Sequence, residues 1–168
     1  MDANPVVLDL ACGEGRNGLN LVGNSINTVF ADINGEALAK VELAVNRLLN
    51  ENKNLAKYWQ VDFEQENTQP LLQQSFNAIL VFRYLHRPLF NQIKAAIKPG
   101  GMIIYETFTT QQAQFGRPKN SDFLLKPKEL KQLFSGWKIL HYFDGVITAA
   151  NGGNVKQAIA QIVAIKPE

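Results

Sequence analysis

The stretch that organises this sequence is Val6-Val7-Leu8-Asp9-Leu10-Ala11-Cys12-Gly13-Glu14-Gly15-Arg16-Asn17-Gly18. Its first five residues form an almost continuous apolar run, which is typical of a parallel strand covered on both faces. The three glycines that follow predict a tight turn leading into a helix. Because glycine has no Cβ, such a turn lets a bound molecule approach the backbone closely. The stretch therefore predicts a strand, a ligand-binding turn and a helix start.

Asp9 discriminates between two kinds of ligand for this turn. Read literally, Gly13-x-Gly15-x-x-Gly18 matches the dinucleotide fingerprint, in which a pyrophosphate binds the amides of the following helix. A carboxylate just before the glycines would repel a pyrophosphate and attract a cation. The sequence thus favours a cationic ligand, and an NAD-dependent oxidoreductase is the less favoured alternative. A surface Asp that caps the next helix is the structural alternative.

The run from Leu8 to Gly15 resembles the first motif of the class I S-adenosylmethionine-dependent methyltransferases, whose cofactor carries an ammonium and a sulfonium. With Arg16 and Asn17 included, it is similar to the tellurite-resistance-type branch of that superfamily. The resemblance covers Val6 to Ile165 and implies S-adenosylmethionine as cofactor and S-adenosylhomocysteine as product. It also implies an α/β fold, a Rossmann-like, doubly wound, mostly parallel seven-stranded sheet. Its antiparallel C-terminal strand would lie between the fifth and sixth strands.

Length and composition limit the remaining possibilities. A chain of 168 residues with 46% hydrophobic content predicts one domain over residues 1–168. A net charge of +2 with 19% charged residues does not indicate a nucleic-acid partner. A single cysteine excludes an internal disulfide, and no Cys/His spacing suggests a metal site. Since neither a leader nor a membrane-length apolar run is evident, we expect a cytoplasmic monomer or homodimer without a membrane partner.

Further apolar runs predict the other strands. They are Thr28–Asp32, Tyr58–Phe63, Phe76–Phe82, Met102–Glu106, Trp137–Phe143 and Val155–Ile165. Apolar residues at helical spacing predict an amphipathic helix from Asn34 to about Asn50. Shorter helices are expected at residues 19–23, 89–97 and 126–134, and irregular loops at 64–74, 107–123 and 144–154. Lys98-Pro99-Gly100-Gly101 predicts a helix stop and a reversal of the chain.

Asp32 and Asp62 lie at the carboxyl ends of two predicted strands. An acidic residue about 20 positions beyond a glycine turn typically meets a ribose, so Asp32 fits that role, although it could instead cap the helix that follows. The resemblance implies that Asp62 accepts a hydrogen bond from the adenine amino group and that Phe63 packs on the ring. Without this resemblance, Asp62 would be interpreted as a solvated residue at the end of a strand. The resemblance implies these cofactor-binding residues: Asp9, Ala11, Cys12, Gly13, Gly15, Arg16, Asn17, Asp32, Ile33, Asp62, Phe63 and Phe82.

The acceptor side is less defined by the sequence. Methyl transfer is an in-line displacement that depends mainly on orientation, and it needs a general base only if the acceptor arrives protonated. His86 is the first candidate base by position, followed by Tyr84 and Glu106, because each follows a predicted strand. His86 could equally begin a helix and make only a local hydrogen bond.

An anionic acceptor would need a cation, and a guanidinium suits carboxylates and oxyanions. Arg117 is the preferred candidate because it lies on the long loop after the fifth strand; Arg83 and Arg87 are alternatives. The expected function is therefore methyl transfer from S-adenosylmethionine to a small molecule such as a thiol, a metalloid oxyanion or a small anion.

Related enzymes usually begin with a helix that folds over the methionine end of the cofactor. Here the first predicted strand begins at Val6, so we expect this N-terminal lid helix to be absent. The long loop after the fifth strand, or a neighbouring subunit, would then close the site. A non-catalytic cofactor-binding or interaction domain is the main alternative.

Overall fold

The computed structural model of this protein describes residues 5–48, 53–148 and 154–168. The strands are β1 Val6–Leu10, β2 Asn27–Asp32, β3 Ala56–Gln60, β4 Phe76–Phe82, β5 Ile97–Phe108, β6 Lys138–Thr148 and β7 Lys156–Ile165. The α-helices are α1 Arg16–Gly23, α2 Gly35–Leu48, α3 Phe90–Ala96 and α4 Glu129–Leu133. Short 3-10 helices are η1 Lys53–Leu55, η2 Arg87–Leu89, η3 Thr110–Gln114 and η4 Ser121–Phe123.

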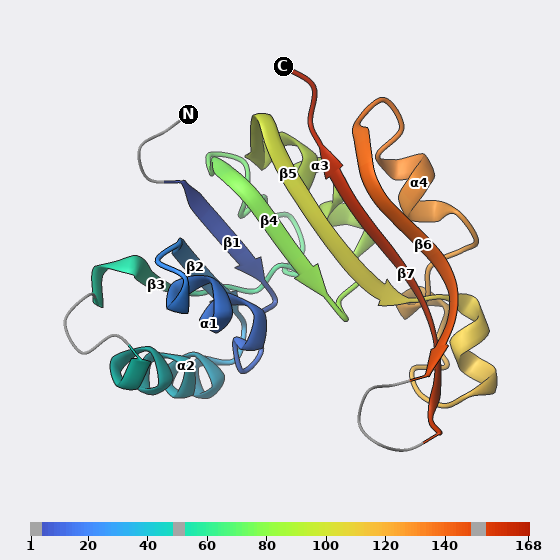
Figure 1. Cartoon of the computed structure of the whole chain (residues 1–168), viewed down its shortest axis with the longest axis horizontal. Helices are drawn as coiled ribbons and strands as arrows, with labels where there is room; N and C mark the ends of the chain where they lie inside the picture. Colours follow the sequence, from blue (N-terminus) through green and yellow to red (C-terminus); the bar gives the residue numbers. More distant parts are fainter. Residues whose placement is uncertain (1–4, 49–52, 149–153) are drawn as a thin grey trace.

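The strands form one seven-stranded sheet in the order β3-β2-β1-β4-β5-β7-β6 (Figure 1). Strands β1 to β5 pair in parallel, and β7 is antiparallel to both of its neighbours, β5 and β6. This order confirms the predicted sheet, including the antiparallel last strand between the fifth and sixth. The carboxyl ends of β1, β2 and β4 meet at one edge, where ligands of open α/β sheets bind.

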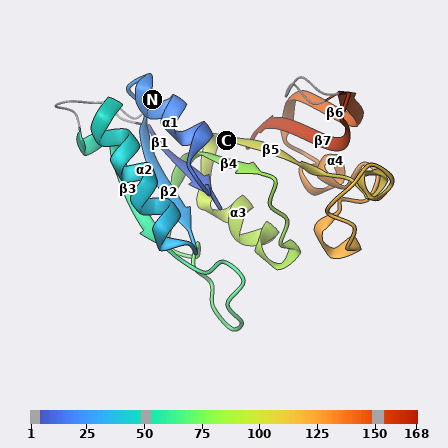
Figure 2. The same cartoon turned by 90° about the horizontal axis from the view of Figure 1, so that it is seen from below.

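Helices cover both faces of the sheet (Figure 2). Helices α1 and α2 pack on β2 through a cluster that includes Val22, Phe30 and Val41. Helices α3 and α4 belong to the larger cluster on the opposite face, to which β1 contributes Leu8 and Leu10. Because side chains alternate along a strand, the residue between those two leucines points toward α1. None of the helices in the described segments combines the length and apolar composition of a membrane span.

Three predicted strands have boundaries that differ from the structure by more than one residue. Strand β3 ends at Gln60, so Asp62 and Phe63 lie in the turn after it. Strand β5 begins at Ile97, and the expected Lys-Pro-Gly-Gly turn is a bulge within it, where the register against β4 shifts. Strand β6 continues to Thr148, because it pairs with β7 along its length. Strands β5 and β6 are extended by pairing with strands far away in the sequence, which local composition does not predict.

The helices also differ from the prediction. Helix α1 begins at Arg16 rather than at residue 19, and the stretch predicted as helix 89–97 contains η2 and a shorter α3. Helix α4 covers only Glu129–Leu133, and the long loop after β5 contains η3 and η4. The predicted end of the second helix near Asn50 and residues 149–153 of the last predicted loop lie outside the described residues.

Candidate functional site

The turn between β1 and α1 is built from residues with left-handed backbone conformation. Ala11, Gly13 and Gly15 have φ values of 52°, 53° and 70°. At Gly15 the reason for glycine is packing, because a Cβ there would lie 2.8 Å from a methyl carbon of Val41. At Gly13 a Cβ would have no neighbour within 4 Å, so the space above this backbone is open. The turn therefore exposes a stretch of backbone that a ligand can approach closely.

Asp9 does not face this open space, which corrects the expectation that its carboxylate meets the ligand. Its side chain is buried at 2% exposure, and Oδ2 accepts a 2.8 Å hydrogen bond from the Gly18 amide. The alternation of β1 turns it toward α1. Burial raises the pKa of Asp9 to about 6; the Gly18 hydrogen bond opposes this shift, and the charge of Asp32 adds to it. Asp9 shapes the turn and carries a negative charge behind it.

Two amides of the turn are already paired within the protein. The Gly13 amide donates to Asp32 Oδ2 at 2.7 Å, and the Gly15 amide donates to the Cys12 carbonyl at 2.8 Å. A dinucleotide-binding turn needs such amides free for the pyrophosphate. The carboxylates of Asp32 and Asp9 also accept from the Gly13 and Gly18 amides, so they would repel a pyrophosphate at this turn. This arrangement argues against the NAD alternative.

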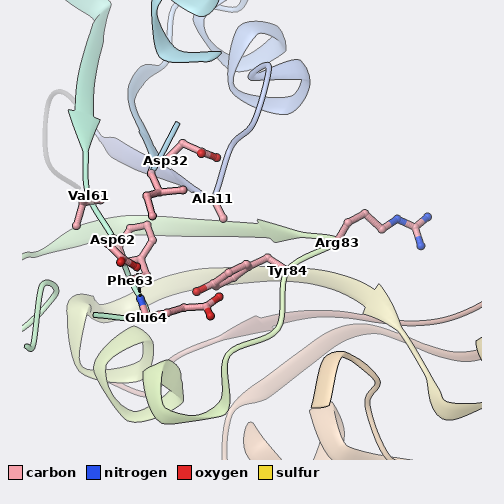
Figure 3. Close-up of a pocket in the computed structure, with 9 residues that line it drawn as sticks. Ala11, Asp32, Val61, Asp62, Phe63, Glu64, Arg83 and Tyr84 are labelled. Carbon is pink, nitrogen blue, oxygen red and sulfur yellow. Dashed lines mark hydrogen bonds between the residues drawn. The ribbon is translucent and has the colours of Figure 1, made fainter. Parts of the chain in front are cut away.

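A cavity of about 500 Å³ opens beside the turn (Figure 3). We call it the Asp62 cavity, and it is lined by Ala11, Asp32, Ile33, Val61, Asp62, Phe63, Glu64, Arg83 and Tyr84. These residues come from the ends of β1, β2 and β4 and from the turn after β3. Its volume is within the range of small-molecule and cofactor sites. The structure thus brings predicted cofactor-binding residues from three segments to one cavity, together with the acceptor candidates Arg83 and Tyr84.

Asp32 and Asp62 both retain capacity to bind a ligand. Asp32 Oδ1 accepts from the Asn34 amide at 2.9 Å, and Asp62 Oδ1 accepts from the Glu64 amide at 2.8 Å. Each carboxylate oxygen has a second lone pair for a ligand donor. The first turn of α2 is capped by Asn34, whose Oδ1 accepts from the amides of residues 36 and 37, so Asp32 is not the helix cap.

Apolar side chains complete the Asp62 cavity. Ile33 is 61% exposed although it is a large aliphatic residue, and it borders the cavity together with Val61. Phe63 is buried and packs edge-on against Trp59, with ring centroids 5.7 Å apart. A flat ring could therefore lie among these apolar side chains, with polar groups on its edge facing Asp32 and Asp62.

A second cavity of about 660 Å³ lies by the start of α1. We call it the Arg16 cavity, and it is lined by Cys12, Glu14, Arg16, Asn17, Leu19, Phe82, Arg83 and Glu106. Of the predicted cofactor residues it contains Cys12, Arg16, Asn17 and Phe82, whereas Gly13 and Gly15 line neither cavity. Arg83 borders both cavities, so the two lie next to each other at the carboxyl edge of the sheet.

Arg83 is held by several contacts. Its backbone is left-handed, with φ 58°, and its guanidinium pairs with Glu106 at 3.0 Å and with Gln157 at 3.1 Å. The guanidinium also lies over the Phe108 ring, 4.4 Å from its centroid. Glu106 is thus occupied by an ion pair, and it also accepts from Gln161. A paired carboxylate is poorly suited to the role of general base that we considered for Glu106.

Tyr84 points into the Asp62 cavity toward Glu64 (Figure 3). Its hydroxyl is buried and has no hydrogen-bond partner of good geometry among the described residues. Burial raises the pKa of Tyr84, and the nearby Glu64 carboxylate raises it further. The hydroxyl therefore stays protonated near neutral pH, where it can donate a hydrogen bond to a ligand but cannot act as a phenolate base.

The other predicted acceptor residues lie elsewhere. His86 precedes η2, its carbonyl accepts from the Leu89 amide at 3.1 Å, and it lines neither cavity. Arg117 is exposed and also lines neither. Arg87 binds Glu129 through two hydrogen bonds of 2.7 and 2.9 Å, and so is not free to bind an anion. The geometry favours none of these three as an acceptor contact.

Some lining residues were missed by the sequence reasoning. Val61 and Glu64 flank the predicted pair Asp62 and Phe63, and Leu19 borders the Arg16 cavity. Proximity to Asp62 was the available signal for the first two. Cys12 behaves as expected of a packing residue, because burial, reinforced by the charges of Asp9 and Asp32, raises its pKa to about 12. Among the described residues, no His, Cys, Asp and Glu cluster could hold a metal ion.

The sheet order and the glycine turn place this protein in the class that has the class I S-adenosylmethionine-dependent methyltransferase fold. Within that class, residues 3–163 match the family model described as tellurite resistance protein TehB. The chain therefore belongs to the TehB family. No curated protein sequence matches the chain significantly.

Solved structures share this fold at low sequence identity. TehB from Haemophilus influenzae is 21% identical with a TM-score of 0.78, over 98% of this chain and 58% of that one. A methyltransferase from Methanosarcina mazei is 17% identical with a TM-score of 0.71, over 99% and 94%. The glycopeptide N-methyltransferase MtfA, complexed with S-adenosylmethionine, is 15% identical with a TM-score of 0.66, over 99% and 89%. This chain thus spans less than two thirds of the Haemophilus protein.

Proposed function

We propose that this protein binds S-adenosylmethionine and transfers its methyl group to a small-molecule acceptor. The observation that carries the proposal is that Asp32, Asp62 and Ala11, which opens the glycine turn, border one cavity of cofactor size. Membership of the TehB family supports it, as do fold neighbours described as methyltransferases.

The residues of the Asp62 cavity fit the adenosine part of this cofactor. Asp32 would accept hydrogen bonds from the ribose hydroxyls, and Asp62 would accept one from the adenine amino group. Ile33 and Phe63 would pack against the ring. The exposed Ile33 supports this assignment, because a bound ring would cover apolar surface that is otherwise in contact with water.

The residues of the Arg16 cavity fit the charged end of the cofactor. Arg16 would pair with the methionine carboxylate, and Asn17 would hydrogen-bond beside it. The negative charges of Asp9 and Asp32 behind the turn favour a cationic sulfonium over an anionic group. When bound, the cofactor supplies an activated methyl group on a good leaving group. The protein's part is to align the acceptor and exclude water, which is worth roughly 7–11 kcal/mol in favourable cases.

Isothermal titration of the full chain with S-adenosylhomocysteine, and separately with NAD, tests the binding half of the proposal. We expect one molecule of S-adenosylhomocysteine to bind per chain and NAD not to bind. Transfer of a labelled methyl group to a mixture of thiols, metalloid oxyanions and small carboxylates tests the catalytic half. Binding without transfer to any acceptor would instead support the non-catalytic alternative, and binding of NAD alone would overturn the proposal.

A further inference from the structure

A third hollow lies beside the Asp62 cavity and has no role in binding the cofactor as assigned above. Its volume is about 210 Å³, and it shares Glu64, Arg83 and Tyr84 with the Asp62 cavity. We call it the Phe123 pocket. At about 30 Å³ for each water molecule in the liquid, it has room for a molecule about the size of a substituted benzene ring. Its position next to the proposed methyl donor suits an acceptor site.

Four of the eight residues that line the Phe123 pocket are apolar, and they come from separate segments. Leu85 follows β4, Phe108 ends β5, and Pro118 and Phe123 belong to the segment between β5 and α4. Phe123 is 49% exposed, so its ring offers apolar surface that an occupant would cover. Because aromatic rings favour stacked and edge-to-face contacts, two Phe side chains suit a planar aromatic occupant.

The charges around the pocket disfavour a metalloid oxyanion. Arg83 is the only cationic side chain among the residues that line it, and its guanidinium already pairs with Glu106 at 3.0 Å and covers Phe108. Glu64 brings a carboxylate to the same pocket, where it raises the pKa of Tyr84. An oxyanion would enter already charged, lose its hydration and meet this carboxylate without a free cation to compensate, whereas an acceptor that enters uncharged would not.

The polar groups that line the pocket also limit the nucleophile. The Tyr84 hydroxyl stays protonated, the Thr107 hydroxyl is not a base near neutral pH, and the Glu64 carboxylate is a weak one. The acceptor must therefore ionise largely by itself. Thiols do so much more readily than alcohols, with a pKa of about 8.5 in cysteine. A thiol on an aromatic ring is more acidic still.

We propose that the Phe123 pocket is the acceptor site and that its substrate class is small aromatic thiols, an inference that rests on the proposed function. The thiol enters the pocket uncharged and releases its proton to solvent there, beside the positively charged sulfonium. The thiolate sulfur then attacks the methyl carbon of S-adenosylmethionine, and the new sulfur–carbon bond forms as the bond from that carbon to the sulfonium breaks. The products are the aryl methyl thioether and S-adenosylhomocysteine.

The experiment uses the full chain with S-adenosylmethionine and three acceptors tested separately: thiophenol, 2-mercaptoethanol and sodium tellurite. Methylated products are quantified by mass spectrometry, and reactions without protein give the spontaneous background. We expect kcat/KM for thiophenol to exceed that for 2-mercaptoethanol by at least about tenfold, the discrimination that a complementary apolar pocket provides. Tellurite should react more slowly than thiophenol.

Phe123→Ala links this preference to the pocket. Because Phe123 is half exposed, its truncation should leave the protein folded, which circular dichroism checks. We expect KM for thiophenol to rise about tenfold, with the affinity for S-adenosylhomocysteine unchanged and 2-mercaptoethanol turnover little affected. Leu43→Ala, which truncates a 58% exposed residue on α2, is the matched control and should change neither acceptor.

The outcomes separate this inference from the proposed function. If S-adenosylhomocysteine does not bind, the proposed function itself is wrong. If it binds and thiophenol is not methylated above background, or tellurite is the better acceptor, the aromatic-thiol assignment is overturned while cofactor binding stands. An unchanged KM for thiophenol in Phe123→Ala would show that the acceptor binds elsewhere.

Discussion

Asp9 Oδ2 and the Gly18 amide are joined by a hydrogen bond of 2.8 Å, which ties the end of β1 to the first turn of α1. The carboxylate is almost completely buried, and its pKa is raised to about 6 by that burial. The Asp9 carboxyl group therefore holds the turn in shape, and its charged form lowers the free energy of unfolding because it is buried.

Asp9→Asn should change how stability depends on pH. Because the folded-state pKa of Asp9 is raised above its ordinary value of 3.8, the folded protein holds this proton more tightly than the unfolded chain. The favourable contribution is complete below about pH 3.8 and is lost as the pH rises to about 6. Asn does not titrate, so the free energy of unfolding of Asp9→Asn relative to the wild type should rise between pH 4 and pH 7.

Urea unfolding at several pH values measures this difference. The rise should not exceed about 3 kcal/mol, since a shift of about two pKa units corresponds to that energy. A difference between the two proteins that stays constant from pH 4 to pH 7 would contradict the raised pKa of Asp9.

Gly18→Ala should destabilise the protein. A Cβ at this position would lie 2.8 Å from Asp9 Oδ2 and would clash with the Phe30 ring, both of which are fixed in the core. We expect a loss of about 1–3 kcal/mol in the free energy of unfolding, measured by denaturant titration. Gly23→Ala in the same helix is the control, because its Cβ would have no neighbour within 4 Å. That change should be neutral or slightly stabilising, and equal effects of the two substitutions would refute the packing argument.

Asp32→Asn should weaken cofactor binding. Asp32 Oδ2 holds the Gly13 amide at 2.7 Å, and the carboxylate is the proposed ribose contact. An amide group can offer only one of the two acceptor oxygens, so a charge-assisted hydrogen bond worth about 1.5–3 kcal/mol is lost. The Kd for S-adenosylhomocysteine should rise at least about tenfold in isothermal titration. Glu36→Gln, an exposed substitution on α2, serves as control and should leave the Kd unchanged.

Arg87→Lys should loosen the segment that carries Phe123. Arg87 binds both carboxylate oxygens of Glu129 and the carbonyls of Asp122 and Leu124, at 2.7–3.0 Å. Lys cannot reproduce this planar set of donors. We expect a loss of about 1–2 kcal/mol in unfolding free energy and a higher acceptor KM, without a change in cofactor affinity.

The exposed ion pair between Lys40 and Glu14, at 3.3 Å, provides the control for Arg87→Lys. Lys40→Ala should alter the free energy of unfolding by less than about 0.5 kcal/mol, because such surface pairs contribute little. If Arg87→Lys is as stable as Lys40→Ala and keeps the wild-type acceptor KM, Arg87 does not position this segment.

Cys12 should resist alkylation. Burial, with the added charges of Asp9 and Asp32, raises its pKa to about 12, and the thiolate is the reactive form. At pH 8 we expect iodoacetamide to label Cys12 at least about a hundredfold more slowly than free cysteine, as followed by mass spectrometry. Labelling at the rate of free cysteine would show that the thiol is neither buried nor shielded by negative charge.

Strand positions were predictable where burial alone decides them. The runs Val6–Leu10 and Phe76–Phe82 are apolar except for Asp9 and Asn77, and they match β1 and β4 residue for residue. The antiparallel order of the last strands was also predicted, but through the family resemblance of the chain rather than through periodicity. The boundaries of β5 and β6 were not predictable, because pairing with β4 extends β5 back to Ile97 and pairing with β7 extends β6 to Thr148, through residues with turn-like composition.

The sequence by itself determined the segments that meet at the site, because each of Asp32, Asp62 and the glycine turn follows an apolar run or a strand-like pattern. It did not determine which way a side chain points at that edge. Only the tertiary structure turned Asp9 toward Gly18, paired Glu106 with Arg83 and left Arg117 outside both cavities. The physical reason is that local composition governs which residues are buried, whereas the partners of a charged group are chosen by packing between segments far apart in the chain.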